Sequence, residues 1–154
     1  MDKGKVISLL NNALEENKEL FLIELKFLAD NKIYVEVDGD NGVPLKECIR
    51  ISREIEHNLD REEEDFSLEV ASPDVANPLK VNRQYIKNIN RILNVKLRDN
   101  TTLQGELKSV SDNEIELEWK VREPKPIGKG KITVVKKATI QFENILESKV
   151  KITF

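Results

Sequence analysis

The sequence predicts an α+β protein of two domains, an N-terminal α/β layer at residues 1–81 and a small antiparallel β-barrel at residues 82–154. In the first part, apolar residues recur in some segments at the three- and four-residue spacing of a helix and in others at every second position, as in a strand. In the second part they recur at every second position almost throughout. The sign of the charge also changes. Residues 1–80 carry 10 Lys and Arg against 19 Asp and Glu, whereas residues 81–154 carry 15 against 9. Two modules with different surfaces explain this division.

The first domain is expected to follow the order helix, strand, strand, helix, strand. Helical spacing runs through 6–14 and 45–59, and alternating hydrophobic residues, each set on one face, run through 21–27, 33–37 and 66–70. The sequence Asp-Gly-Asp-Asn-Gly at 38–42 predicts a turn, and Pro44 suits the first turn of the second helix. Cys48 lies on the apolar stripe of that helix, so we expect it to be a small buried hydrophobic residue.

The second domain is expected to begin with a short helix and to continue as strands. The helix is predicted at about residues 83–88, with Asn82 as its N-cap. Alternation then recurs at 95–97, 103–107, 115–121, 132–135, 139–142 and 150–154. Five or six antiparallel strands in so short a segment indicate a small barrel, and Gly105 is placed for the sharp bend that a barrel requires.

Composition limits the function classes. The chain is 34% charged and 39% hydrophobic, which is typical of a soluble globular protein. One cysteine and one histidine exclude an internal disulfide and argue against a zinc or Cys-His site. No apolar run suits a membrane span or a signal peptide. We therefore expect a cytoplasmic protein with no membrane partner, no metal, no cofactor and no small-molecule substrate.

Two local patterns resemble reactive sites, but the residues around them differ from those that such sites require. Ser72 follows an apolar strand, as a hydrolase nucleophile does, but the flanking glycines of that turn are absent. The acidic turn at 38–42 resembles a calcium loop, but Val43 stands where glycine is needed and Ile49 where a bidentate glutamate is needed. No catalytic residue is predicted, and we expect that the protein is not an enzyme.

The strongest candidate surface is basic. Residues 120–137 include seven basic residues and one acidic residue. The centre of this span is EPKPIGKGK at 123–131, a loop interrupted by proline and glycine. A flexible cationic loop suits RNA phosphates, whereas lysines that keep a sheet edge soluble would give the same pattern. Both interpretations stay open. The candidate ribosome- or RNA-binding residues are Lys120, Arg122, Lys125, Lys129 and Lys131 of this span, with Lys96, Arg98 and Lys108 on neighbouring strands.

Two longer segments resemble a known family. VDGDNGVPLKECIRISREIEHNLD at 37–60 and LEVASPDVANPLK at 68–80 are similar to the bacterial ribosome maturation factor RimP family. The second segment departs from the family pattern at Asp74, where glycine is usual, and at Asn77, where arginine is usual. LRDNTTLQGELKSVSDNEIELEW at 97–119 is similar to the first Sm signature.

The resemblance implies a KH-like αββαβ domain followed by an Sm-like, SH3-type barrel. It implies a monomeric, non-enzymatic assembly factor that binds the immature 30S small ribosomal subunit, with its 16S rRNA and small-subunit proteins, and promotes its maturation. No GxxG loop occurs in the first domain, so RNA clamping of the KH type is not expected. Ser72, Pro73 and Pro78 then belong to a domain junction, where the prolines end the strand. The alternative is an Sm-like RNA-binding or translation-associated adaptor that acts off the ribosome.

Overall fold

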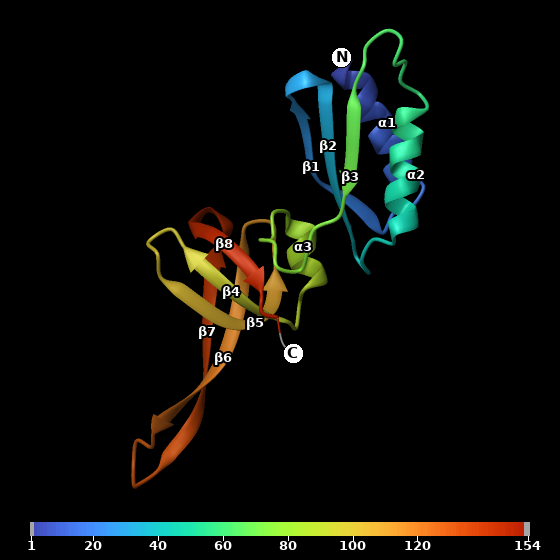
Figure 1. Ribbon diagram of the computed structural model, residues 1–154. Helices are drawn as coiled ribbons and strands as arrows, with labels where there is room; N and C mark the ends of the chain where they lie inside the picture. Colours follow the sequence, from blue (N-terminus) through green and yellow to red (C-terminus); the bar gives the residue numbers. More distant parts are fainter. Residues whose placement is uncertain (1, 153–154) are drawn as a thin grey trace. The chain divides into compact units, whose positions relative to one another are not determined.

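The computed structural model describes residues 2–152 and contains both helices and sheets, which confirms the predicted α+β class (Figure 1). The chain divides into two compact units, with the division between Asp74 and Val75. The first unit holds a sheet of three strands and the second a sheet of five. Each unit has its own hydrophobic core.

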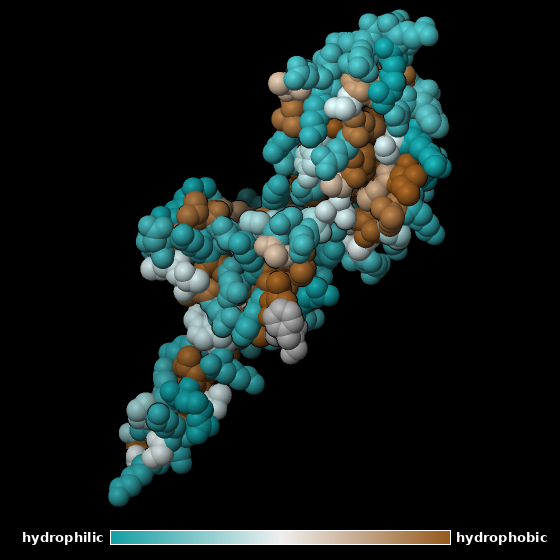
Figure 2. All heavy atoms as spheres, viewed as in Figure 1, coloured by the Kyte–Doolittle hydropathy of each residue, from teal (hydrophilic) through white to brown (hydrophobic). Residues whose placement is uncertain are grey.

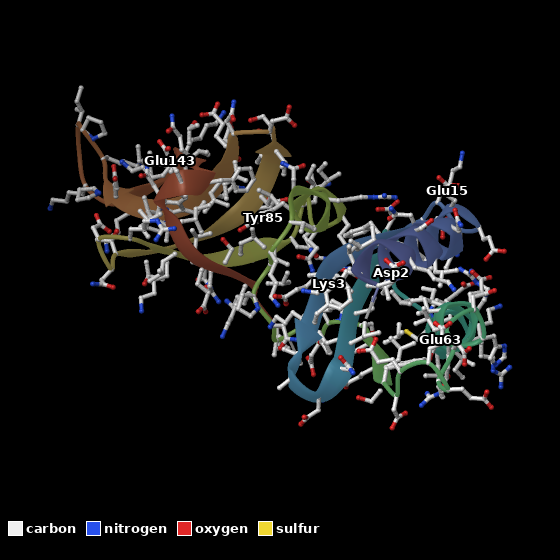
Figure 3. All side chains as sticks on the ribbon, turned by 90° about the horizontal axis from the view of Figure 1, so that it is seen from above. Asp2, Lys3, Glu15, Glu63, Tyr85 and Glu143 are labelled. Carbon is white, nitrogen blue, oxygen red and sulfur yellow. The ribbon has the colours of Figure 1, made fainter. Side chains whose placement is uncertain are left out.

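The first unit has the predicted order of elements. It consists of α1 (Lys3–Glu15), β1 (Leu20–Leu28), β2 (Lys32–Gly39), α2 (Leu45–Glu56) and β3 (Ser67–Ala71). The central strand β2 pairs with β1 antiparallel and with β3 parallel, and the two helices lie on the same side of the sheet (Figure 1). Asp2, labelled in Figure 3, caps α1 because its Oδ1 accepts the Lys5 N–H at 3.0 Å.

The core of the first unit lies between the helices and β2. Its fully buried side chains are Val6, Leu10 and Ala13 on α1, Ile33, Val35 and Val37 on β2, and Ile51 and Ile55 on α2. Cys48 is buried as predicted, and this burial raises the pKa of its thiol, which disfavours a reactive thiolate. The predicted stripe of α2 is wrong at its first position, because Leu45 is 76% exposed.

Strand β1 departs from the predicted alternation. A β-bulge between Leu22 and Glu24 shifts its register against β2. Leu22 therefore packs against the core before the bulge, and Leu25 and Phe27 pack against it afterwards. The prediction that residues 21, 23, 25 and 27 share one core-facing side is wrong, since the extra residue of a bulge moves the following side chains to the opposite face.

The second unit is one helix followed by an antiparallel sheet. Its elements are α3 (Asn82–Lys87), β4 (Ile92–Leu97), β5 (Thr102–Val110), β6 (Glu114–Pro124), β7 (Lys131–Gln141) and β8 (Ile145–Val150), and the strand order is β7-β6-β5-β4-β8. The edge strands β7 and β8 are not paired with each other within residues 2–152, so the predicted closed barrel is not confirmed. Asn82 is the first residue of α3 and not its N-cap, and its side chain donates instead to the Ser111 carbonyl at 2.7 Å.

The last strands differ from their predicted bounds. The runs predicted at 132–135 and 139–142 are one continuous strand, β7, and the last strand lies at 145–150. The prediction of a strand at 150–154 falls partly on residues 153–154, which lie outside the described residues. Ser148 is completely buried, so β8 carries a polar residue at a core position. A serine at a core position interrupts the alternation of apolar and polar residues by which a strand is identified in a sequence.

The core of the second unit is formed by Leu93, Val95, Leu107, Ile115 and Leu117, with Tyr85 of α3 packed beside them (Figure 3). The Tyr85 ring meets the Phe142 ring edge to face at 5.0 Å between centroids. Gly105 is closely packed, because a Cβ at this position would lie 3.1 Å from the Glu118 carbonyl oxygen and 3.2 Å from the Trp119 ring, and β6 would have to shift by a few tenths of an ångström to accept it.

Candidate nucleic-acid interface

The second unit carries a two-stranded projection. β5 pairs with β6 only as far as Glu118, whereas β6 and β7 remain paired as far as Pro124 opposite Lys131. Residues 119–136, which we call the ribbon, therefore continue beyond the third strand as a hairpin, and Figure 1 shows them extending away from β4, β5 and β8. Most of its surface is hydrophilic (Figure 2). The missing third strand leaves one hydrogen-bonding edge of β6 unpaired here, and the side chains of the ribbon are exposed or half-buried on both faces.

The ribbon ends in a short, well-defined loop. The Lys125 N–H donates to the Gly130 carbonyl at 3.1 Å and closes residues 125–130. Gly128 and Gly130 have φ of 87° and 95°, the left-handed region in which glycine is favoured. The sequence predicted a longer loop at 123–131. That prediction is wrong at both ends, because cross-strand pairing holds Glu123 and Pro124 of β6 and Lys131 of β7 in strand conformation.

The two faces of the ribbon differ in chemistry. Cross-strand partners share a face, so Lys120, Arg122 and Lys131 lie together on one side, with Thr133 opposite Arg122. The Arg122 Nη1 donates to the Thr133 hydroxyl at 3.3 Å, which holds the guanidinium across the ribbon. The other side carries apolar residues and a salt bridge of 3.0 Å between Lys136 Nζ and Glu123 Oε1. One face is therefore cationic.

The cations of the ribbon are not neutralised by the protein. Within residues 2–152 no carboxylate forms an ion pair with the five basic residues Lys120, Arg122, Lys125, Lys129 and Lys131. The one acid of the ribbon, Glu123, is already paired with Lys136. Unpaired cations on an exposed element leave a positive field available to an anionic partner.

The other three predicted residues lie on the sheet outside the ribbon. Lys96 is exposed on β4, where it pairs across from Glu147 on β8. The Arg98 Nε donates to the Glu143 carbonyl at 2.7 Å, and Lys108 Nζ lies 3.1 Å from Glu106. The structure therefore does not gather all eight predicted residues into one cluster, and two of these three are engaged within the protein.

The junction residues occupy the segment after β3. Ser72 follows the end of the strand at Ala71, and Pro73 and Pro78 lie in the stretch without regular structure that precedes α3. Leu79 already packs against the core of the second unit, and its N–H donates to the Ser148 carbonyl at 2.8 Å. No helix among the described residues has the length and apolar character needed to cross a membrane.

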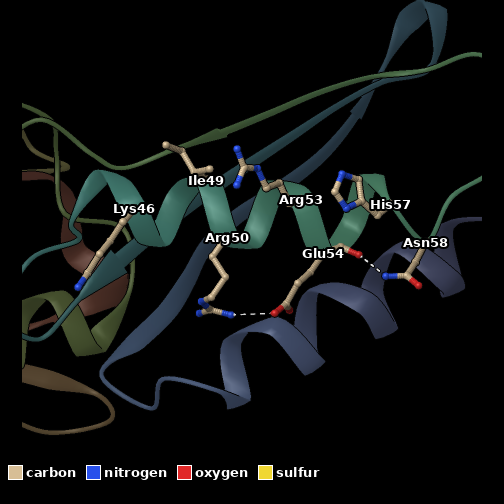
Figure 4. A pocket seen from close by; sticks show the side chains of 7 residues that line it. All are labelled: Lys46, Ile49, Arg50, Arg53, Glu54, His57 and Asn58. Atoms are coloured by element: carbon tan, nitrogen blue, oxygen red, sulfur yellow. Dashed lines mark hydrogen bonds and ion pairs between the residues drawn. The ribbon is translucent and has the colours of Figure 1, made fainter.

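A shallow hollow of about 590 Å³ lies on α2 in the first unit. Figure 4 shows its lining residues Lys46, Ile49, Arg50, Arg53, Glu54, His57 and Asn58. Arg50 dominates it, donating to Glu47 at 2.7 Å, to the Ala13 carbonyl of α1 at 2.9 Å and to Glu54 at 3.3 Å. These contacts tie α2 to α1.

The structural role of Arg50 was not predicted from the sequence. The acidic residues three positions before and four positions after it were the available signal, because that spacing places all three side chains on one side of a helix. Burial and the nearby Glu16 carboxylate raise the pKa of Glu54, while Arg50 acts in the opposite direction. The polar groups of the hollow hold the two helices together, and we assign no ligand to them.

Comparison with known proteins adds a family to this geometry. The model of the RimP N-terminal domain matches residues 9–75. The chain is 54% identical over its full length to the ribosome maturation factor RimP of Christiangramia forsetii, with all of that protein covered. It is 53% identical to that of Flavobacterium psychrophilum, with 99% of this chain and 98% of the relative covered, and 38% identical to that of Porphyromonas gingivalis, with 83% of each covered. The resemblance stated from the sequence is thus confirmed, and the chain belongs to the RimP family of ribosome maturation factors.

Proposed function

We propose that this protein binds the immature 30S subunit and promotes its maturation without catalysing a reaction. The observation that carries the proposal is the ribbon with its five cations Lys120, Arg122, Lys125, Lys129 and Lys131, none of them in an ion pair with a carboxylate of residues 2–152. The partner of the ribbon is 16S rRNA in the precursor, since lysine and arginine on an exposed element bind phosphates without reading bases. The ribosome maturation role of the family supports this assignment.

The proposal extends to the two domains. We assign a KH-like topology to residues 1–81 and an Sm-like one to residues 82–154, with Ser72, Pro73 and Pro78 as a structural junction. The element order of the first unit and the helix followed by five antiparallel strands in the second support these assignments. The acidic first half suits contact with basic ribosomal proteins, while the basic second half suits RNA. The protein acts as a monomer in the cytoplasm.

The competing function is an RNA-binding adaptor that acts off the ribosome, which the same cations would also serve. Sedimentation of a cell lysate through a sucrose gradient separates the two. The proposal predicts that the protein migrates with small-subunit precursors and that cells lacking it accumulate precursor 16S rRNA. Migration only with free RNA in the light fractions, together with normal rRNA processing in those cells, would establish the adaptor instead.

A further inference from the structure

The tip of the ribbon carries an apolar side chain that the protein leaves in solvent. Ile127 is 90% exposed, more than any other large hydrophobic residue among those described. It lies in the loop between Pro126 and Gly128, with Lys125 and Lys129 two positions away on either side. A single exposed aliphatic residue is common on protein surfaces. This one differs in its place, at the end of a projecting element and between unpaired cations.

The loop is built to hold Ile127 outward. The hydrogen bond from the Lys125 N–H to the Gly130 carbonyl closes the loop. Pro126 fixes its own φ, and the positive φ of Gly128 and Gly130 lets the chain reverse direction just after the isoleucine. The side chain is therefore presented at the end of the ribbon by a loop whose two ends are held together.

We propose that Ile127 is a wedge that enters double-helical RNA at an interruption such as a bulged nucleotide, while the flanking lysines bind the phosphates on either side. This inference rests on the proposed function and adds the kind of RNA that is bound. Apolar side chains at the tips of basic elements insert between base steps and partly unstack them. The cost of unstacking is smallest where a base is already unpaired or mismatched. The ribbon would then select interrupted helices by shape and deformability.

Charge favours RNA over a protein as the occupant. An apolar pocket on a protein would need acidic groups around its rim to accept Lys125, Lys129 and Lys131, none of which has a carboxylate partner among residues 2–152. Phosphates line both sides of every RNA helix, so the positions flanking the wedge are filled without further requirement.

The test uses two RNA hairpins that both carry a 2-aminopurine and differ by one nucleotide, which is bulged beside the 2-aminopurine in one hairpin and absent from the fully paired other. Wild type is expected to bind the bulged hairpin about ten-fold more tightly, the effect expected from burying part of one aliphatic side chain. It should also raise the 2-aminopurine fluorescence. Ile127→Ser should lose both effects and keep the salt dependence of binding. The control Ile132→Ser removes a residue that is 38% exposed on the other face of the ribbon, and it should behave as wild type.

The outcomes separate the wedge from the proposed function. If Ile127→Ser equals wild type on both hairpins while reversal of the lysine charges abolishes binding, RNA binding stands and the wedge is wrong. If neither change affects binding to either hairpin, both inferences fall. If Ile127→Ser weakens binding to precursor subunits but not to either hairpin, the tip meets a protein, and the wedge is again wrong. Circular dichroism of each variant verifies the fold, which an exposed side chain should not affect.

Discussion

Reversing the charge at the end of the ribbon tests whether its cations bind phosphate or only keep the sheet edge soluble. The change is Lys125→Glu, Lys129→Glu and Lys131→Glu in one protein. All three side chains are exposed, and none of them has a carboxylate partner among residues 2–152. The free energy of unfolding should therefore change by no more than about 0.5 kcal/mol per site.

Binding should respond far more strongly than stability. Each phosphate contact contributes about 0.9 to the slope of log affinity against log salt on a duplex, so three contacts contribute about 2.7. Between 50 and 200 mM salt, a slope difference of this size changes the ratio of wild-type to variant affinity by about forty-fold. The assay is fluorescence anisotropy with labelled small-subunit precursor or an RNA hairpin at four salt concentrations.

A matched control keeps the net charge the same. Reversing three exposed lysines of the first unit, Lys5, Lys32 and Lys46, gives the same total charge without touching the ribbon, and it should leave the slope close to that of wild type. The reasoning is refuted if the ribbon variant retains both the affinity and the slope of wild type. The ribbon lysines would then serve solubility, and the search for phosphate contacts would move to Lys96, Arg98 and Lys108.

Three further predictions concern the two folds. Gly105→Ala should lower the free energy of unfolding by about 1–3 kcal/mol in urea denaturation, because the new Cβ would press on the backbone of β6; an unchanged midpoint would mean that the strand yields freely. Arg50→Ala should lower the free energy of unfolding by about 1–2 kcal/mol at pH 7. The loss should be smaller near pH 4, because Glu54, whose pKa is raised, is protonated there and no longer forms an ion pair with Arg50; equal losses at both pH values would contradict this. Burial and the hydrogen bond to Glu36 raise the pKa of Tyr34 to about 12, so its contribution to stability is present below pH 10 and is lost as the pH rises toward 12. Absorbance titration of Tyr34→Phe should lose the Tyr34 part of the late transition and keep that of Tyr85, whose pKa is also raised by burial; an unchanged titration would contradict this.

The parts of the fold that followed from the sequence are those where hydrophobic spacing and burial coincide. Ile33, Val35 and Val37 alternate in the sequence and are all fully buried on β2, so the strand and its core-facing side were predictable. The face of β1 was not, because a bulge is fixed by pairing with β2 and leaves no mark in local spacing. β8 was misplaced since the buried Ser148 interrupts its apolar pattern.

The basic residues of the candidate site were predicted from the sequence, but the projecting hairpin that carries them was not. The cluster of basic residues was visible in the sequence, and glycines and prolines suggested a broad loop at 123–131. The structure instead places Lys120 and Arg122 on β6, which stays paired with β7 beyond the point where its pairing with β5 ends. Whether a strand has a third neighbour depends on the lengths of segments distant in sequence. Residue spacing within β6 cannot reveal it.

The shape of the ribbon bears on how the proposed assembly factor would leave the subunit once that subunit has matured. On the proposed function, binding rests mainly on phosphate contacts, which form rapidly and weaken steeply with salt or with the loss of accessible phosphates. A hairpin that extends beyond its sheet needs an open RNA surface along its cationic face, where Lys120, Arg122 and Lys131 lie. As the subunit matures, folded RNA and ribosomal proteins would cover that surface, and each phosphate lost to the five cations would lower the affinity further. We infer that release follows from occlusion of the RNA, so that no chemical step in this protein is required to end the interaction.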